Sequence, residues 1–70
     1  MNAEVFFEVI QEGDGGYVAE CLTEAIVTQG ESWDELRGNV LEAVKAYFFD
    51  TKVPDSIRIR LVRDEYLAVG

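Results

Sequence analysis

The sequence predicts an α+β domain: a three-stranded antiparallel β-meander, one α-helix packed on one face of the sheet, and then a fourth strand. Three observations support this order. The first half holds three short segments rich in β-branched and aromatic residues, separated by turn residues. A stretch with apolar side chains at three- and four-residue spacing follows, and a last segment alternates apolar and basic residues. We expect a single domain over residues 1–70, because a chain of 70 residues accommodates one small core.

The first two expected strands form a hairpin. Residues 5–10 (Val-Phe-Phe-Glu-Val-Ile) and 17–22 (Tyr-Val-Ala-Glu-Cys-Leu) are rich in residue types that favour strands. Between them, residues 13–16 (Gly-Asp-Gly-Gly) can adopt the backbone angles that a tight hairpin turn requires. A third strand is expected over residues 26–29, and Gly30 ends it.

A helix is expected to begin after Ser32 and to end near Phe49 or Asp50. Ser32 can cap the N-terminus, and Glu35 three residues later completes a capping box. Gly38 lies inside this stretch, where glycine lowers helix stability, so we expect it to allow close packing of another segment. The residues at helical spacing predict the face that packs on the sheet: Trp33, Leu36, Val40, Leu41, Val44, Tyr47 and Phe48.

The last expected strand covers residues 57–62, where apolar and basic residues alternate. Residues 64–69 (Asp-Glu-Tyr-Leu-Ala-Val) follow it. Their pattern fits two arrangements, an extension of the strand past a bulge or a tail docked on the body of the domain.

The arginines of the last strand, Arg58 and Arg60, share the face opposite to its apolar residues. Pairing with Glu4 or Glu8 on a neighbouring strand is the simplest interpretation of these charges. A weak nucleic-acid patch that includes Arg63 is the alternative, because a basic cluster is what phosphate binding requires.

The first expected strand has apolar residues on both faces. Val5, Phe7 and Val9 alternate with Phe6 and Ile10. One helix covers only one face of a sheet, so if the first set faces the helix, Phe6 and Ile10 remain on the uncovered side. Large apolar residues on an open face are typical of an interface between subunits, although single exposed apolar residues are also common.

The charge of the chain is unevenly distributed. The formal net charge is −8, and residues 1–35 contain nine acidic and no basic residues, whereas residues 36–70 contain six basic and five acidic ones. A surface of this kind attracts basic proteins and repels nucleic-acid phosphates. Solubility alone is the other explanation of an acidic domain.

Few residues in this chain are suited to catalysis. The chain has no histidine and a single cysteine, Cys21, which we interpret as a small buried residue in a reducing cytoplasm. Neither Cys21 nor Ser32 has a histidine to activate it. Glu4, Glu8 and Glu12 are spread along one strand and cannot converge on a two-metal site, which leaves a metal-dependent nuclease as an alternative only. We therefore expect no enzymatic activity, no cofactor and no bound metal. Because the sequence shows no signal peptide and no long apolar segment, we also expect a cytoplasmic location.

Three blocks in succession carry a resemblance to a known family. Residues 15–21 read Gly-Gly-Tyr-Val-Ala-Glu-Cys, residues 27–32 read Val-Thr-Gln-Gly-Glu-Ser, and the helical stretch over residues 34–47 follows. In their order and spacing these blocks resemble the HicB-like antitoxins. The resemblance implies a partially preserved RNase H-like fold without catalytic activity.

The resemblance also implies a partner. The better-known HicB-like proteins are antitoxins, typically oligomeric, that bind HicA, a small basic toxin that cleaves messenger RNA, and occlude its active site. Many carry a C-terminal DNA-binding domain, whereas this sequence ends at Gly70 without one, so direct DNA binding is not expected. The residues Thr23-Glu24-Ala25 replace the family's usual Pro-Gly connection and shorten a loop that lies where partner contacts are made.

The expected function is therefore a non-catalytic protein-binding module that occludes a small basic toxin. The side chains expected to contact the toxin lie at the hairpin and at the connection after it: Asp14, Tyr17, Glu20 and Glu24. The alternative is a solitary HicB-like domain, a dimer or tetramer, that has no toxin partner and binds another protein or a small ligand. Phe6 and Ile10 are the expected oligomer interface.

Overall fold

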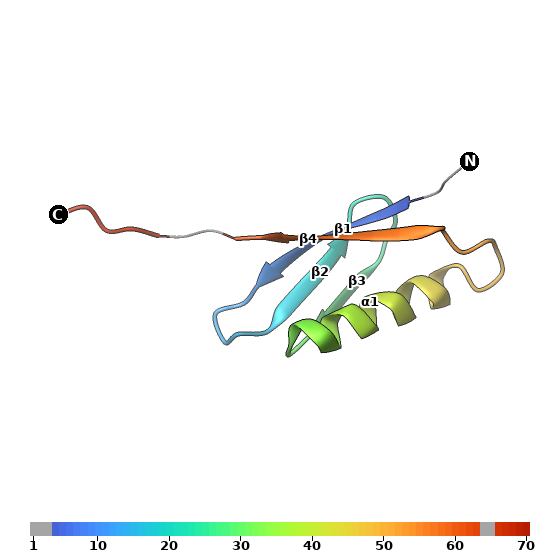
Figure 1. Ribbon diagram of the computed structural model, residues 1–70, viewed down its shortest axis with the longest axis horizontal. Coiled ribbons are helices and arrows are strands. Elements are labelled where there is room, and N and C mark those ends of the chain that lie inside the picture. Colours follow the sequence, from blue (N-terminus) through green and yellow to red (C-terminus); the bar gives the residue numbers. More distant parts are fainter. Residues whose placement is uncertain (1–3, 64–65) are drawn as a thin grey trace.

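The structure, a computed structural model, describes residues 4–63 and 66–70. Its elements appear in Figure 1 in the order that the sequence predicts, so the α+β class and the β-β-β-α-β order are confirmed. The elements are β1 (Glu4–Gln11), β2 (Tyr17–Cys21), β3 (Val27–Gly30), α1 (Trp33–Tyr47) and β4 (Ser56–Val62).

The four strands form one mixed sheet in the order β3-β2-β1-β4. β1 pairs antiparallel with β2, and β2 antiparallel with β3, as expected for a meander. β4 pairs parallel with β1, with Phe7 beside Ile59 in the register. A parallel neighbour needs a long crossover, and α1 supplies it by carrying the chain from one edge of the sheet to the other. β3 and β4 are therefore the two edge strands.

The start of α1 is held by two side chains. The Ser32 hydroxyl accepts a hydrogen bond from the Glu35 N–H at 3.1 Å, as the capping box predicts. The Glu35 carboxylate accepts from the Glu31 N–H, one residue before the cap, also at 3.1 Å. The helix ends at Tyr47 rather than near Phe49 or Asp50. The Phe48 N–H makes the last helical hydrogen bond, to the Val44 carbonyl, and residues 48–50 form a turn in which the Thr51 N–H donates to the Phe48 carbonyl.

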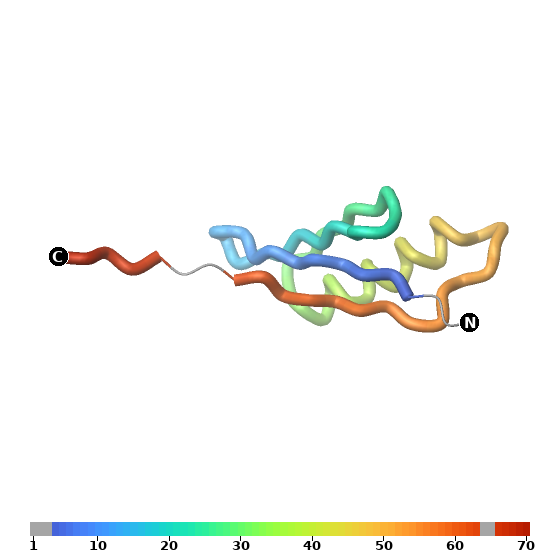
Figure 2. Tube along the Cα trace, turned by 90° about the horizontal axis from the view of Figure 1, so that it is seen from above, coloured from blue at the N-terminus to red at the C-terminus, as the bar shows by residue number. Residues whose placement is uncertain are grey.

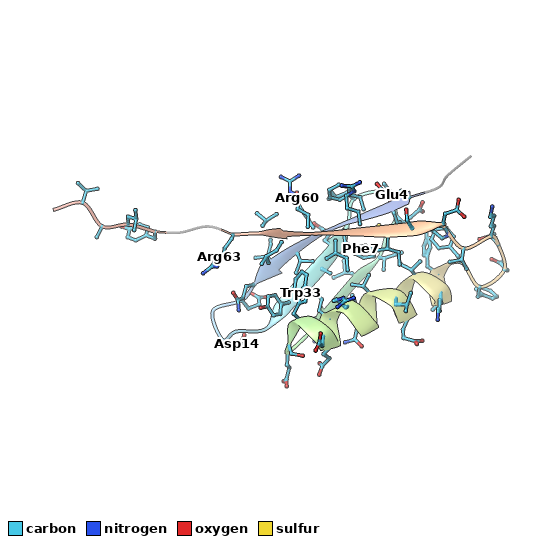
Figure 3. All side chains as sticks on the ribbon, in the orientation of Figure 1. Glu4, Phe7, Asp14, Trp33, Arg60 and Arg63 are labelled. Carbon is cyan, nitrogen blue, oxygen red and sulfur yellow. The ribbon has the colours of Figure 1, made fainter. Side chains whose placement is uncertain are left out.

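The buried core lies between α1 and the adjacent face of the sheet. Val5, Phe7 and Val9 of β1 are buried there, as the alternation predicts. Figure 3 shows Phe7 on the helix side of the sheet, while Arg60 and Glu4 project from the opposite face. The core is completed by residues of β2, of α1 and of the connection before β3: Ala19, Cys21, Ile26, Leu36, Val40 and Val44.

Three details differ from the sequence-based expectations. Leu41 and Tyr47 are exposed, so the apolar face of α1 is narrower than its spacing suggests. β3 is shifted by one residue and includes Gly30, while Ile26 is buried in the connection before it. The close approach expected at Gly38 occurs instead at Gly30, where an added Cβ would lie 2.5 Å from the Leu36 backbone nitrogen; nothing lies within 4 Å of such an atom at Gly38.

The C-terminal residues 66–70 form neither helix nor strand and are exposed. Figures 1 and 2 both show them extending away from the sheet, roughly in line with β4. The docked tail is therefore not observed for these residues, and the extension of β4 past a bulge falls on residues 64 and 65, which lie outside the described part of the chain. In the described part, no helix is long and apolar enough to cross a membrane.

Candidate functional site

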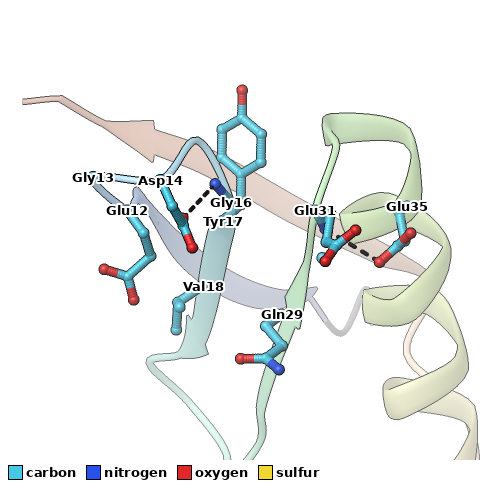
Figure 4. A pocket seen from close by; sticks show the side chains of 10 residues that line it. Glu12, Gly13, Asp14, Gly16, Tyr17, Val18, Gln29, Glu31 and Glu35 are labelled. Atoms are coloured by element: carbon cyan, nitrogen blue, oxygen red, sulfur yellow. Dashed lines mark hydrogen bonds between the residues drawn. The ribbon is translucent and has the colours of Figure 1, made fainter.

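An acidic hollow lies at the hairpin end of the sheet, beside the start of α1. It has a volume of about 610 Å³ and is lined by the β1–β2 turn, the end of β3 and the first turn of the helix (Figure 4). Four of its lining side chains are acidic, and we call them the acidic rim: Glu12, Asp14, Glu31 and Glu35. No lysine or arginine is among the described residues that line it.

The hairpin turn that carries half of the rim is well hydrogen-bonded. The Asp14 carboxylate accepts from the Gly16 N–H at 3.0 Å, and the Gly15 N–H donates to the Glu12 carbonyl at 3.0 Å. Gly15 has a φ of +96°, in the left-handed region that favours glycine. One Asp14 oxygen therefore fixes the turn, and the carboxylate retains acceptor capacity for a partner.

An aromatic pair joins the hairpin to the helix at this site. The rings of Tyr17 and Trp33 meet edge to face, with centroids 5.4 Å apart and planes at 75°. The Gln11 side-chain amide donates to the Tyr17 hydroxyl at 3.4 Å. This contact positions the rim residues of the turn relative to those of the helix start, so the hollow is built from two elements held together by aromatic packing.

The chemistry that this arrangement favours is the binding of cationic side chains. Carboxylates accept charge-assisted hydrogen bonds from arginine and lysine. In the described residues, no group of three or more acidic or cysteine side chains is arranged to hold a metal ion. The rim carboxylates are distributed around the hollow, which suits several contacts to a basic protein surface.

The four residues expected to contact a partner do not form one cluster. Asp14 and Tyr17 both line the hollow. Glu20 lies on the open face of the sheet, paired in register with Glu8. Glu24 lies in the connection between β2 and β3, at the opposite end of β2. The structure thus brings two of the four residues together and separates the others.

Glu24 has a local contact that the sequence does not reveal. Hydrogen bonding to the Glu24 side chain and its negative charge raise the pKa of Tyr47, at the end of α1, above its ordinary value of 10.0. The backbone N–H of Glu24 also donates to the Cys21 sulfur at 3.3 Å. Glu24 therefore influences the end of α1 through Tyr47 and braces its own connection through Cys21.

The residues that the sequence analysis missed are Glu12, Glu31 and Glu35. Glu31 and Glu35 reach the hollow because Tyr17 pairs with Gly30 in the register, which brings the helix start next to the hairpin. The available signal was the capping box, which fixes where the helix begins. It does not reveal which turn the helix start lies against.

The open face of the sheet carries an apolar row beside the hairpin end. Ile10 pairs in register with Val18 on one side and Val62 on the other, and Ile10 is 55% exposed. Phe6 is half-buried on the same face and accepts, through its carbonyl, a hydrogen bond from the Leu22 N–H at 2.8 Å. Phe6 and Ile10 thus lie on the face away from the helix, as expected, among further apolar side chains.

The arginines of β4 lie on this open face too. Arg58 forms an ion pair with Glu4, with 3.2 Å between Nε and Oε1, which confirms the interpretation of Arg58 as a cross-strand partner. Arg60 stands beside Glu8 in the register. The open face therefore combines apolar residues with charges of both signs.

Comparisons with known proteins give one relative that spans almost the whole chain. A protein of Thermotoga maritima described as a UPF0150 protein is 36% identical over 66 residues, which cover 94% of this chain and 93% of the relative. No family model matches the chain. No solved structure matches it either.

Proposed function

The chain belongs to the UPF0150 family, and from that premise we propose that it is a non-catalytic protein-binding module of the HicB-like type. The proposed partner is a small basic protein, a HicA-type RNase toxin, whose active site the module occludes. The observation that carries the proposal is the acidic hollow at the hairpin end, with its four carboxylates and Tyr17.

Charge complementarity supports this proposal. A basic toxin approaching the hairpin end meets the half of the chain that holds nine acidic residues and no basic one. Complementary charges of this kind speed association and orient the partner. Tyr17, which lines the hollow, packs on Trp33 and so holds the acidic turn beside the helix start.

The test is a binding titration between this chain and the small basic protein that co-purifies with it from its native cells. We expect one partner per chain and a much weaker complex at about 0.5 M than at about 0.1 M salt, because the charges are exposed. Absence of a stoichiometric basic partner contradicts the proposal.

A matched pair of variants locates the contact. Glu12→Gln with Glu31→Gln removes two rim charges without touching the carboxylates of Asp14 and Glu35, which hold the turn and the helix start. We expect binding to weaken by about tenfold or more. The control removes two charges elsewhere, with Glu42→Gln and Asp50→Asn. Equal weakening by both pairs indicates a general charge effect and contradicts a site at the hollow.

The second candidate function is a solitary oligomeric domain without a toxin partner. The apolar row of the exposed Ile10 and the half-buried Val18 and Val62 favours it, because such a row on an open sheet face is suited to self-association. In this case Ile10→Asp converts the oligomer into a folded monomer in analytical ultracentrifugation. An unchanged mass contradicts an interface at Phe6 and Ile10.

A further inference from the structure

The two edges of the sheet differ in length and in how far they are occupied. β3, at one edge, is four residues long, and the Asn39 side-chain amide of α1 donates to its Gln29 carbonyl at 2.7 Å. β4, at the other edge, is seven residues long and, in the described part of the chain, pairs with β1 alone. The register of β4 with β1 runs without interruption, so no bulge twists this edge away. β4 therefore presents a continuous edge to which another strand can add.

The helix side of this edge is apolar. α1 packs on β3 and β2 and leaves the helix side of β4 incompletely covered. The uncovered part forms a groove of about 300 Å³, lined by six residues of α1 and β4: Asp34, Arg37, Val40, Leu41, Ile57 and Ile59. Leu61, further along the same side of β4, is 42% exposed. A strand added to this edge would bring its own side chains next to those of β4 on the same face, so apolar residues suit the helix side.

The open-face side of the same edge is basic. Arg58 and Arg60 alternate with the isoleucines of β4 and are exposed, and Figure 3 shows Arg60 projecting from the face away from α1. The ion pair of Arg58 with Glu4 uses its Nε, so the terminal nitrogens of this guanidinium retain donors for another acceptor. Carboxylates on a neighbouring strand can accept charge-assisted hydrogen bonds from such donors.

The same two arginines disfavour pairing of this edge with a second copy of itself. An antiparallel pair of β4 strands centred on residue 58, 59 or 60 places an arginine of one copy opposite an arginine of the other. Like charges directly opposite each other destabilise a strand pair. The edge therefore favours a strand with acidic side chains over a second β4.

We propose that β4 binds an extended segment of a partner protein in which apolar and acidic residues alternate. The segment adds to the sheet as a further strand beside β4. Its apolar side chains lie next to Ile57, Ile59 and Leu61 on the helix side, and its carboxylates lie next to Arg58 and Arg60 on the open face. This surface is distinct from the acidic hollow, so the inference does not rest on the proposed function.

A short synthetic peptide with this alternation tests the proposal. The probe is fluorescently labelled Glu-Val-Glu-Val-Glu-Val-Glu with blocked termini, which has the length of β4 and the same order of residues in both directions. Its valines fall opposite Ile57, Ile59 and Leu61 whether it runs parallel or antiparallel to β4. The matched control, Glu-Glu-Val-Val-Val-Glu-Glu, has the same composition and charge but does not alternate.

Fluorescence anisotropy of each peptide is followed as the full chain is added, up to about 1 mM. We expect the alternating peptide to bind at least about tenfold more tightly than the control, because only alternation separates valines and carboxylates onto the two faces of a strand. Equal affinities, or no saturable binding of the alternating peptide by about 1 mM, overturn the proposal.

Methylation of the peptide backbone distinguishes strand addition from other modes of binding. Alternate residues of an added strand direct their N–H groups towards its neighbour, and the residues between them direct theirs away. One derivative is N-methylated at its valines and a second at its glutamates, so only one of the two loses the hydrogen bonds to β4. We expect binding to be abolished in one derivative and retained in the other. Equal effects of the two methylations contradict pairing at the edge.

A matched pair of protein variants locates the contact. Arg60→Glu reverses a charge on the open face of β4, and Lys45→Glu makes the same change in net charge in the last turn of α1. We expect Arg60→Glu to weaken binding of the alternating peptide by about fivefold or more, and Lys45→Glu to change it by less than about twofold. Both positions are exposed, and circular dichroism verifies the fold of each variant. Equal weakening by the two variants indicates a general charge effect and overturns a site at β4.

Discussion

β1 and β4 lie side by side in the sheet and carry apolar residues at matching positions, but these residues are buried to different extents. Phe7 of β1 is fully buried, whereas its register neighbour Ile59 on β4 is only half-buried. Both point to the helix side. The difference arises because α1 packs on β2 and β3, so one helix completes the core over three strands and leaves the fourth partly uncovered.

The comparison shows where this small domain has completed its own core and where apolar side chains stay partly uncovered. The three-stranded part buries the apolar residues of its helix side and carries acidic side chains at the hairpin end. The β4 part keeps a partly uncovered helix-side face and, in the described part of the chain, a free edge, to which a further strand can add. The following predictions test this division, from the largest expected effect to the smallest.

Truncation of the buried β1 residue should have the largest effect on stability. Phe7→Ala should lower the free energy of unfolding by about 3–5 kcal/mol, because it removes a ring from the centre of the core and leaves a cavity. Urea unfolding followed by circular dichroism measures the loss. A loss below about 1 kcal/mol would mean that the core collapses around the truncated side chain and is packed less tightly than the structure indicates.

Alanine substitutions at two glycines of the helix-covered part should change the stability of the domain in opposite directions. Gly30→Ala should destabilise the domain by about 1–3 kcal/mol, because its Cβ would lie 2.5 Å from the backbone of Leu36. Gly38→Ala should stabilise it by up to about 1 kcal/mol, since the site is an open helix position. Thermal unfolding of the two variants provides the comparison. If Gly38→Ala destabilised the domain, the result would indicate that another segment packs closely on Gly38, as the sequence suggested.

Truncation on β4 should have a smaller effect on stability. Ile59→Ala should lower the free energy of unfolding by about 1 kcal/mol, because the side chain is only half-buried. Urea unfolding measures the loss. A loss equal to that of Phe7→Ala would mean that the two strands are buried to the same extent.

The sequence predicts the parts of this fold that depend on local patterns. The alternation in β1 identifies the buried face at Val5, Phe7 and Val9, and the capping box at Ser32 identifies the helix start. Both are properties of neighbouring residues along the chain. The helix end is less well defined, because the return of the chain to β4 ends the helix before the apolar pattern does.

The candidate site is less predictable because it depends on how separate elements meet. Glu31 and Glu35 join Asp14 only through the β2–β3 register and the packing of Trp33 against Tyr17. The sequence grouped Glu24 with Asp14 because both flank β2. The strand between them separates its two ends by roughly 3.3 Å per residue.

The smallest effect concerns Tyr47 and Glu24, at the end of the three-stranded part opposite to the acidic hollow. Because Glu24 raises the pKa of Tyr47 in the folded state, the folded protein holds the phenol proton more tightly than the unfolded chain does. The resulting stabilisation is fully present below the unfolded pKa near 10 and is lost as the pH rises through the higher folded pKa. Glu24→Gln should therefore lower the pKa of Tyr47 towards its ordinary value, measured by the ultraviolet absorbance of the phenolate with a Tyr47→Phe variant to assign the signal. An unchanged pKa would leave Glu24 free for a partner and return it to the set of expected contact residues.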